Sequence, residues 1–174
     1  MIKNLIWRIL PLLLNQKFKQ KDFGSIPLQI QKVFLIMPEF NNDVLESQSV
    51  IDSLVSQGKT VTILLNQEKL ALLQNSFSFK VIEYFPSDKS RFGFPQKNLR
   101  RLLKKEKSDL VINLYKKENI FAAYCTGLIQ SEYKAAFSSL RSEKLFNIQF
   151  KAENQNSHDS YKNFLNCLYM FFNK

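Results

Sequence analysis

Residues 32–65 read KVFLIMPEFNNDVLESQSVIDSLVSQGKTVTILL, and this stretch decides the fold. Residues 32–37 and 59–65 are short, continuous apolar runs, the pattern of strands buried on both faces of a parallel sheet. Between them, apolar residues recur at helical spacing over 43–57, and Gly58 follows as a helix-ending residue. The stretch therefore predicts a strand, a helix and a second strand joined by a right-handed crossover.

The same alternation continues through the rest of the chain. Further strands are predicted at 79–84, 109–114 and 134–138, with a sixth candidate at 146–150, and helices at 67–74, 95–107, 118–129 and 159–172. Such alternation predicts a three-layer, Rossmann-like α/β fold with a mainly parallel sheet of about five strands and helices on both faces. Because 174 residues are too few for two ordinary domains, we expect one domain over 25–174, preceded by a helix and linker over 1–24.

Composition indicates a folded, basic protein. Apolar residues make up 45% of the chain and charged residues 23%, close to the average for globular domains. The 25 Lys and Arg against 15 Asp and Glu give a net charge of +10, which favours an anionic partner. A high pI that serves only solubility is the alternative. Cys125 and Cys167 lie far apart in apolar surroundings, which is typical of a reducing, cytoplasmic compartment.

Residues 3–21 predict a basic amphipathic helix kinked near Pro11. The segment is too short and too charged to cross a bilayer, and it lacks the cleavage site of a signal peptide. Two interpretations stay open: the helix lies on an anionic membrane, or it packs its leucine face onto the core. The membrane-facing candidates are Lys3, Trp7, Arg8, Lys17, Lys19 and Lys21.

Several catalytic chemistries do not fit this composition. A single histidine, His158, and two distant cysteines leave no set for a Ser-His-Asp site or a zinc centre. The four glycines cannot form a dinucleotide fingerprint or a P-loop. We therefore predict no metal and no cofactor.

Ligands of doubly wound sheets bind beyond the carboxyl ends of the strands, which directs attention to two loops. Residues 38–43 follow the first strand and are acidic and amide-rich, and residues 115–119 follow the strand at 109–114. The ligand candidates are Glu39, Asn41, Asn42, Asp43, Tyr115, Lys116, Glu118 and Asn119. The alternative for Asn42 and Asp43 is that they only cap the helix that follows.

The most concentrated positive segment surrounds the predicted helix at 95–107. Leu99, Leu102 and Leu103 form its expected inward stripe, so the cations fan over the outer surface. The candidates for contact with an anionic partner are Arg91, Lys97, Arg100, Arg101, Lys104 and Lys105. A merely solvated helix face has the same pattern, and both interpretations stay open.

Several motifs carry a resemblance to known families. The matching stretches are VFLIM (33–37), DVL (43–45), GKTVTILL (58–65) and DLVINL (109–114). Together they resemble the N-terminal, acceptor-side half of heptosyltransferase-type glycosyltransferases, the ADP-heptose:lipopolysaccharide class. That resemblance implies a catalytic base at Asp43 and a nucleotide-sugar donor bound by a second Rossmann-like half. FGFP (92–95) and DLVINLYKKEN (109–119) are similar to an uncharacterised family of small basic Bacteroidota proteins, which implies a bacterial origin.

Three functional hypotheses follow. The first is a non-enzymatic binding or adaptor module at an anionic surface, such as the inner face of the membrane, with that surface or a protein as partner. The second is a degenerate or half glycosyltransferase, the acceptor-side domain, which needs a separate donor-binding partner. The third is a nucleic-acid-associated basic protein. We expect the first, and if the protein is an enzyme we expect it to be glycosyltransferase-like.

Overall fold

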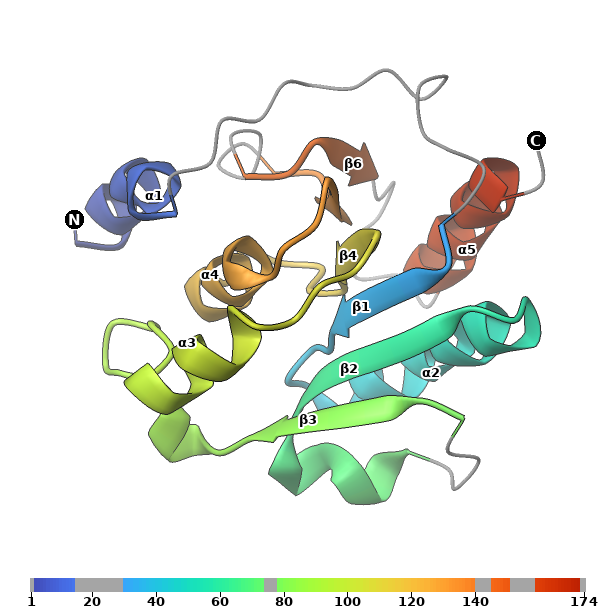
Figure 1. Cartoon of the computed structure of the whole chain (residues 1–174), viewed down its shortest axis with the longest axis horizontal. Helices are drawn as coiled ribbons and strands as arrows, with labels where there is room; N and C mark the ends of the chain where they lie inside the picture. The colour runs from blue at the N-terminus through green and yellow to red at the C-terminus, as the bar shows by residue number, and fades with distance from the viewer. Residues whose placement is uncertain (1, 15–29, 74–77, 140–144, 151–158, 173–174) are drawn as a thin grey trace.

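The sheet has six strands, all parallel, in the order β3-β2-β1-β4-β5-β6 (Figure 1). The computed structural model describes residues 2–14, 30–73, 78–139, 145–150 and 159–172. The strands are β1 (Lys32–Ile36), β2 (Thr60–Asn66), β3 (Lys80–Tyr84), β4 (Leu110–Asn113), β5 (Tyr133–Phe137) and β6 (Ile148–Phe150). The predicted Rossmann-like fold is confirmed, and the candidate strand at 146–150 is a sixth, parallel member of the sheet.

Helices cover both faces of this sheet (Figure 1). They are α1 (Ile2–Leu13), α2 (Asn41–Ser56), α3 (Lys97–Leu103), α4 (Ile120–Leu128) and α5 (Asp159–Phe172), with the 3₁₀ helices η2 (Gln67–Leu72) and η3 (Pro86–Asp88). Within β1, Val33 and Leu35 pack beneath α2 and α5, whereas Phe34 and Ile36 pack beneath α3 and α4. Burial on both sides explains why β1 is a continuous apolar run.

The N-terminal helix packs against α4 through one of its faces. Ile6, Trp7 and Leu10 are buried, and Trp7 and Leu10 join Tyr124 and Phe146 in a third apolar cluster. The prediction of Trp7 as a membrane-facing residue is therefore wrong, because its side chain fills the space beside α4. Arg8 is exposed, whereas Lys17, Lys19 and Lys21 lie outside the described residues, as does the side chain of Lys3.

Two predicted helices differ from expectation. The segment expected as a helix at 67–74 forms the 3₁₀ helix η2, in which the Asn66 side chain accepts a hydrogen bond from Glu68 N. The helix α3 is shorter than the predicted 95–107, so its two turns bury only Leu99 and Leu103. Leu102, expected to face inward, is exposed instead. None of the helices within the described residues is long and apolar enough to span a bilayer.

Asp109, immediately before β4, ties the two central strands together at their amino ends. Its Oδ2 accepts hydrogen bonds from the backbone N–H groups of Gln31, at 2.9 Å, and Lys32, at 2.8 Å. The register of the pair places Val33 opposite Leu110. A single carboxylate therefore helps to align β1 with β4.

Lys134 gives a pH dependence to the stability of the sheet. It is buried in β5 and its Nζ donates to Gly127 O at 3.1 Å, and burial lowers its pKa from 10.5 to about 8. Between these two values the unfolded chain binds more protons than the folded one, so the free energy of unfolding rises with pH. We expect the wild type to gain about 2 kcal/mol over Lys134→Met between pH 7 and pH 10 in urea denaturation. A difference between the two proteins that is constant with pH would contradict this assignment.

Candidate ligand-binding site

The strand order reverses direction between β1 and β4, so the loops that follow these two strands diverge and leave a crevice between them. A pocket of about 530 Å³ occupies this position. One wall comes from the loop after β1 and the first turns of α2, and the other from the loop after β4. The lining residues are Pro38, Phe40, Asn41, Asn42, Asp43, Glu46, Tyr115, Lys116 and Lys117. The structure thus brings together the two loops that the sequence identified separately.

Lys116 is the central charged group of this crevice. Its side chain is only 8% exposed, and its Nζ lies 2.9 Å from Asp43 Oδ1 and 2.8 Å from Glu46 Oε2. Burial by itself lowers the pKa of Lys116, but the hydrogen bonds and negative charges of Glu46 and Asp43 more than offset it, so that the net pKa is raised. Lys116 is therefore a fixed ammonium that joins the two walls of the crevice.

Tyr161 of α5 packs against Lys116 of this cluster. Its ring centroid lies 4.5 Å from Lys116 Nζ, and its buried hydroxyl donates to Leu114 O at 2.8 Å. Burial first, and then the charges of Asp43 and Glu46, raise the pKa of the Tyr161 phenol. The neutral phenol holds the carboxyl end of β4 in place, which positions the loop that carries Lys116.

A second cluster lies beside the crevice and includes Glu39, which the sequence had placed among the ligand candidates. Glu39 does not line the pocket; its carboxylate pairs with Lys89 and accepts a hydrogen bond from the Tyr84 hydroxyl at 3.4 Å. Burial raises the pKa of Tyr84 to about 12. Lys89 Nζ also lies 4.6 Å from the ring centroid of Phe121. The Glu39 carboxylate is therefore bound to Lys89 and Tyr84 rather than directed into the crevice.

Tyr115 connects the two clusters. It lines the crevice, and its buried hydroxyl lies beside that of Tyr84 without a hydrogen-bond partner of good geometry among the described residues. Burial raises the pKa of Tyr115 well above its usual value. Its backbone N–H donates to the Asn113 side chain at 3.0 Å, which shapes the turn after β4. Tyr115 thus lines the crevice while its neutral hydroxyl stays buried beside Tyr84.

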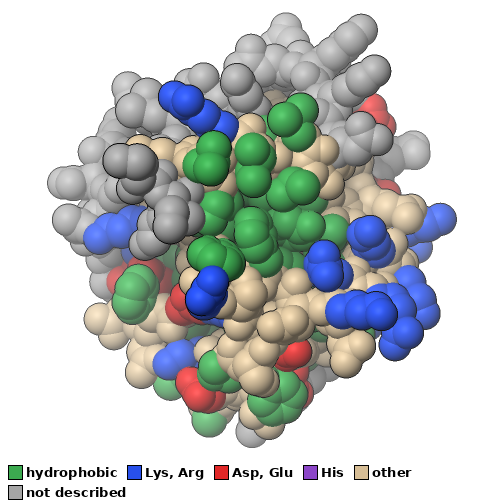
Figure 2. Space-filling view, turned by 90° about the vertical axis from the view of Figure 1, so that its left-hand side faces the viewer, with side chains coloured by type: hydrophobic (Ala, Val, Ile, Leu, Met, Phe, Trp, Pro, Cys, Tyr) green, Lys and Arg blue, Asp and Glu red, His purple; other side chains and the backbone are tan. Residues whose placement is uncertain are grey.

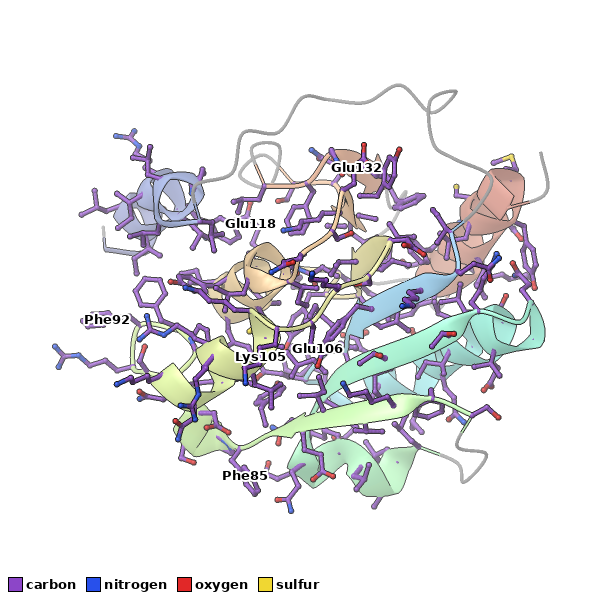
Figure 3. The ribbon with its side chains drawn as sticks, in the orientation of Figure 1. Phe85, Phe92, Lys105, Glu106, Glu118 and Glu132 are labelled. Carbon is purple, nitrogen blue, oxygen red and sulfur yellow. The ribbon has the colours of Figure 1, made fainter. Side chains whose placement is uncertain are left out.

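The remaining ligand candidates have different positions. Asn42 lines the crevice, and Asn41 Oδ1 accepts a hydrogen bond from Lys69 Nζ at 2.7 Å. Asn119 caps α4 by accepting from Ala122 N at 3.0 Å, and Glu118 is exposed in the loop before that helix (Figure 3). Asn42 and Asp43 do not cap α2 through hydrogen bonds, because the helix begins after Phe40 without a side-chain cap. Asp43 does lie in the first turn, where its charge complements the helix dipole, and it also pairs with Lys116.

Sequence reasoning missed two members of the crevice cluster, Glu46 and Tyr161. Glu46 is three residues after Asp43, so both carboxylates lie on one face of α2. That spacing was a readable signal. Tyr161 had no comparable signal, because it was predicted only as part of the apolar face of the last helix. Among the described residues, no group of three His, Cys, Asp or Glu side chains is arranged to hold a metal ion.

The cations predicted to contact an anionic partner lie on α3 and next to it in the chain. Five of them line a separate groove: Lys97, Arg100, Arg101, Lys104 and Lys105. Arg91, in the preceding loop, instead lies 4.6 Å from the ring centroid of Phe92. No residue lines both the groove and the crevice.

Three similar solved structures are named as glycosyltransferases. A family 9 glycosyl transferase from Veillonella parvula superimposes with a TM-score of 0.63 at 15% identity, over 87% of this chain and 43% of its own. The E. coli heptosyltransferase WaaC with ADP gives 0.56 at 14% identity, over 79% and 47%, and its complex with ADP-2-deoxy-2-fluoro heptose gives 0.56 at 13%, over 79% and 48%. The chain thus spans less than half the length of each of these enzymes.

The strand order and the position of the crevice define a Rossmann-like domain that resembles one half of a heptosyltransferase-type glycosyltransferase. Identities of 13–15% establish this likeness for the fold alone. The chain belongs to the family of unknown function DUF6913, which matches residues 3–169. Among curated proteins, none matches the chain in sequence.

Proposed function

We propose that this protein is a binding module for a polyhydroxylated, saccharide-type ligand, held in the crevice between the loops after β1 and β4. The observation that carries the proposal is the cluster of Asp43, Lys116 and Glu46 in the wall of a pocket at the switch point of the sheet. Fixed carboxylates, amides and an ammonium are donors and acceptors suited to vicinal hydroxyls. Phe40, exposed at the edge, adds an apolar surface, as ligand sites commonly do.

The charge balance of the crevice favours a neutral ligand. The lining residues include two carboxylates, Asp43 and Glu46, and two ammonium groups, Lys116 and Lys117, so their charges balance. A pyrophosphate would find no excess of positive charge there, whereas neutral hydroxyls can use both kinds of group. The fold likeness to proteins named as heptosyltransferases supports the same chemical class.

The test is Asp43→Asn, which keeps the shape of the side chain and removes its charge. We expect saturation-transfer NMR to detect binding of neutral mono- and disaccharides to the wild type, and we expect the change to weaken it by about tenfold or more. ADP, as an anionic probe, is expected not to compete.

Asp52→Asn is the matched control, because Asp52 is an exposed carboxylate on the same helix α2. It is expected to leave saccharide affinity unchanged. Equal affinities of the Asp43→Asn and wild-type proteins, or no binding of any saccharide by the wild type, would contradict the proposal. If Asp43→Asn binds saccharide normally but loses glycosyl transfer with a separate donor-binding subunit, the half-glycosyltransferase hypothesis applies instead.

A further inference from the structure

The helix α1 has a second apolar face that the core does not use. Polar residues between positions 2 and 13 are only Lys3, Asn4 and Arg8, so the helix is apolar on almost every side. While Ile6, Trp7 and Leu10 are buried, Leu5 is 60% exposed and Leu12 is 78% exposed. Ile9 and Leu13 are exposed beside them. Positions 5, 9, 12 and 13 follow the spacing of one helical stripe, so these side chains form a continuous apolar ridge.

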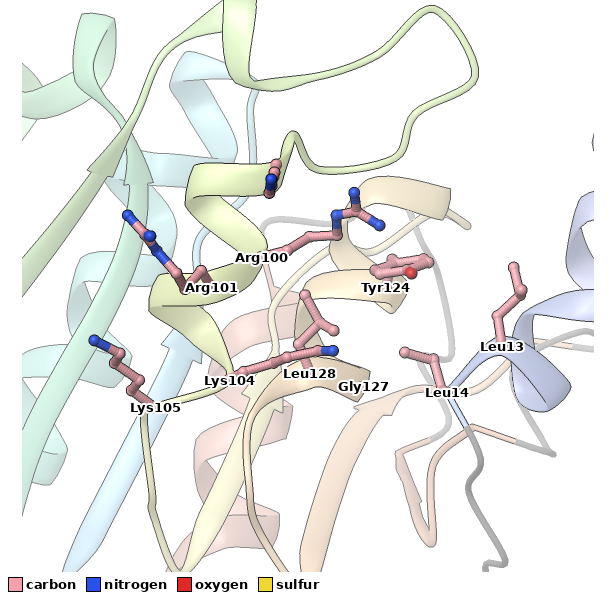
Figure 4. A pocket seen from close by; sticks show the side chains of 10 residues that line it. Leu13, Leu14, Arg100, Arg101, Lys104, Lys105, Tyr124, Gly127 and Leu128 are labelled. Atoms are coloured by element: carbon pink, nitrogen blue, oxygen red, sulfur yellow. The ribbon is translucent and has the colours of Figure 1, made fainter.

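A basic groove lies next to this ridge. It has a volume of about 700 Å³ and runs between the end of α1, α3 and α4 (Figure 4). Its apolar side consists of Leu13, Leu14, Tyr124, Gly127 and Leu128, and its other side of Lys97, Arg100, Arg101, Lys104 and Lys105. No acidic side chain is among these lining residues. Leu14 closes against Gly127, where an added Cβ would clash with the Leu14 side chain.

The ridge and the cations belong to one face of the molecule. Figure 2 shows hydrophobic side chains gathered in the middle of this face, with Lys and Arg side chains flanking them. This arrangement matches a membrane interface: the apolar ridge suits the acyl chains, and the cations beside it suit the anionic headgroups above them. Exposed apolar patches of this kind mark interaction surfaces.

We propose that this face, made of Leu5, Ile9, Leu12 and Leu13 of α1 and the five cations of the groove, docks on an anionic lipid bilayer. The helix α1 then lies in the plane of the interface, with the exposed ridge among the acyl chains and Arg8 and the α3 cations at the headgroup phosphates. The surface goes beyond the proposed saccharide site, with which it shares no lining residue.

The composition of the surface favours lipid over other partners. Protein interfaces are depleted of Lys and enriched in aromatic residues, whereas three of the five groove cations are Lys and the exposed ridge is wholly aliphatic. A nucleic acid would use the cations, but it has no use for an exposed aliphatic ridge. A bilayer engages both features at once.

The experiment is flotation of the full-length protein with vesicles of phosphatidylglycerol and phosphatidylcholine, compared with phosphatidylcholine alone. We expect the wild type to float with the anionic vesicles only. The double variant Leu5→Gln, Leu12→Gln should bind about tenfold more weakly, because the ridge no longer inserts. The double variant Arg101→Gln, Lys104→Gln should also lose about tenfold, with a weaker dependence on salt.

Matched controls exist elsewhere on the surface. Leu45 and Met170 are exposed on α2 and α5, and Lys32 and Lys162 are exposed cations. Leu45→Gln with Met170→Gln, and Lys32→Gln with Lys162→Gln, make the same changes in apolarity and net charge and should leave flotation unchanged. Circular dichroism checks that every variant is folded.

The proposal fails if the wild type does not float with anionic vesicles, or if the control pairs lose as much binding as the face pairs. A nucleic-acid surface would give a third pattern: oligonucleotide binding that depends on Arg101 and Lys104 but not on Leu5 and Leu12, without vesicle binding. That pattern also overturns the proposal. None of these outcomes changes the saccharide test, which depends on Asp43.

Discussion

Lys116→Met is expected to lower the free energy of unfolding by about 3 kcal/mol, the low end of the range for removing one partner from a buried charge cluster. The Asp43 and Glu46 side chains are 22% and 20% exposed, and both carboxylates lie within 3 Å of Lys116 Nζ, at 2.9 and 2.8 Å. Without the ammonium, two poorly hydrated like charges face each other. The contact between Lys116 and the Tyr161 ring is lost as well.

Urea denaturation with Lys117→Met as control measures this effect. Lys117 is the exposed neighbour of Lys116, and its replacement should change stability by less than about 0.5 kcal/mol. The triple variant Lys116→Met, Asp43→Asn, Glu46→Gln should recover most of the loss, because it removes the unpaired charges together with the ammonium. Similar stabilities of the Lys116→Met and Lys117→Met proteins would show that the cluster does not stabilise the fold.

Leu10→Ala is expected to cost about 3 kcal/mol, whereas Leu12→Ala should change stability by less than about 0.5 kcal/mol. The two leucines lie on the same helix, but Leu10 is 0% exposed and Leu12 is 78% exposed. Both substitutions change helix propensity equally, so only the packing of Leu10 against α4 and its neighbours distinguishes them.

Thermal and urea denaturation of the two single variants measure whether only the Leu10 side of α1 stabilises the fold. Equal and small effects would mean that α1 does not contribute to the folded core. If Leu12→Ala is as stable as the wild type yet binds anionic vesicles more weakly, one helix performs two separable tasks, with the core on one face and the membrane on the other.

The fold was accessible from sequence because its main signals are local. The runs at 32–37 and 59–65 are apolar without alternation, and β1 indeed sends Val33 and Phe34 into different layers. The orientation of α1 was not accessible for the opposite reason. The few polar residues of α1 show that the helix is amphipathic, but its apolar residues are too many to indicate which of them pack on the core, so Trp7 and Leu5 could not be distinguished.

The site was accessible only in part. Asp43 and Lys116 each follow a predicted strand, so both could be placed at the carboxyl edge of the sheet. Their ion pair depends on β1 and β4 being neighbours, which is a property of strand order. Tyr161 reaches Leu114 from 47 positions away, a contact for which the sequence has no local signal. Glu39 was predicted to line the ligand site, but its carboxylate instead contacts Lys89 and Tyr84, two residues that are distant in sequence.

Asp109 lies at the amino ends of the central strands, opposite to the crevice, and fixes how these strands are aligned. Its two hydrogen bonds to Gln31 and Lys32 fit only one register of β1 against β4. A slip by one residue moves a strand by about 3.3 Å and exchanges its two faces. Such a slip would carry Lys116 out of reach of Asp43, now 2.9 Å away. The geometry of the ligand crevice therefore depends on hydrogen bonds at the amino ends of the central strands, made by a residue that no ligand in the crevice would touch.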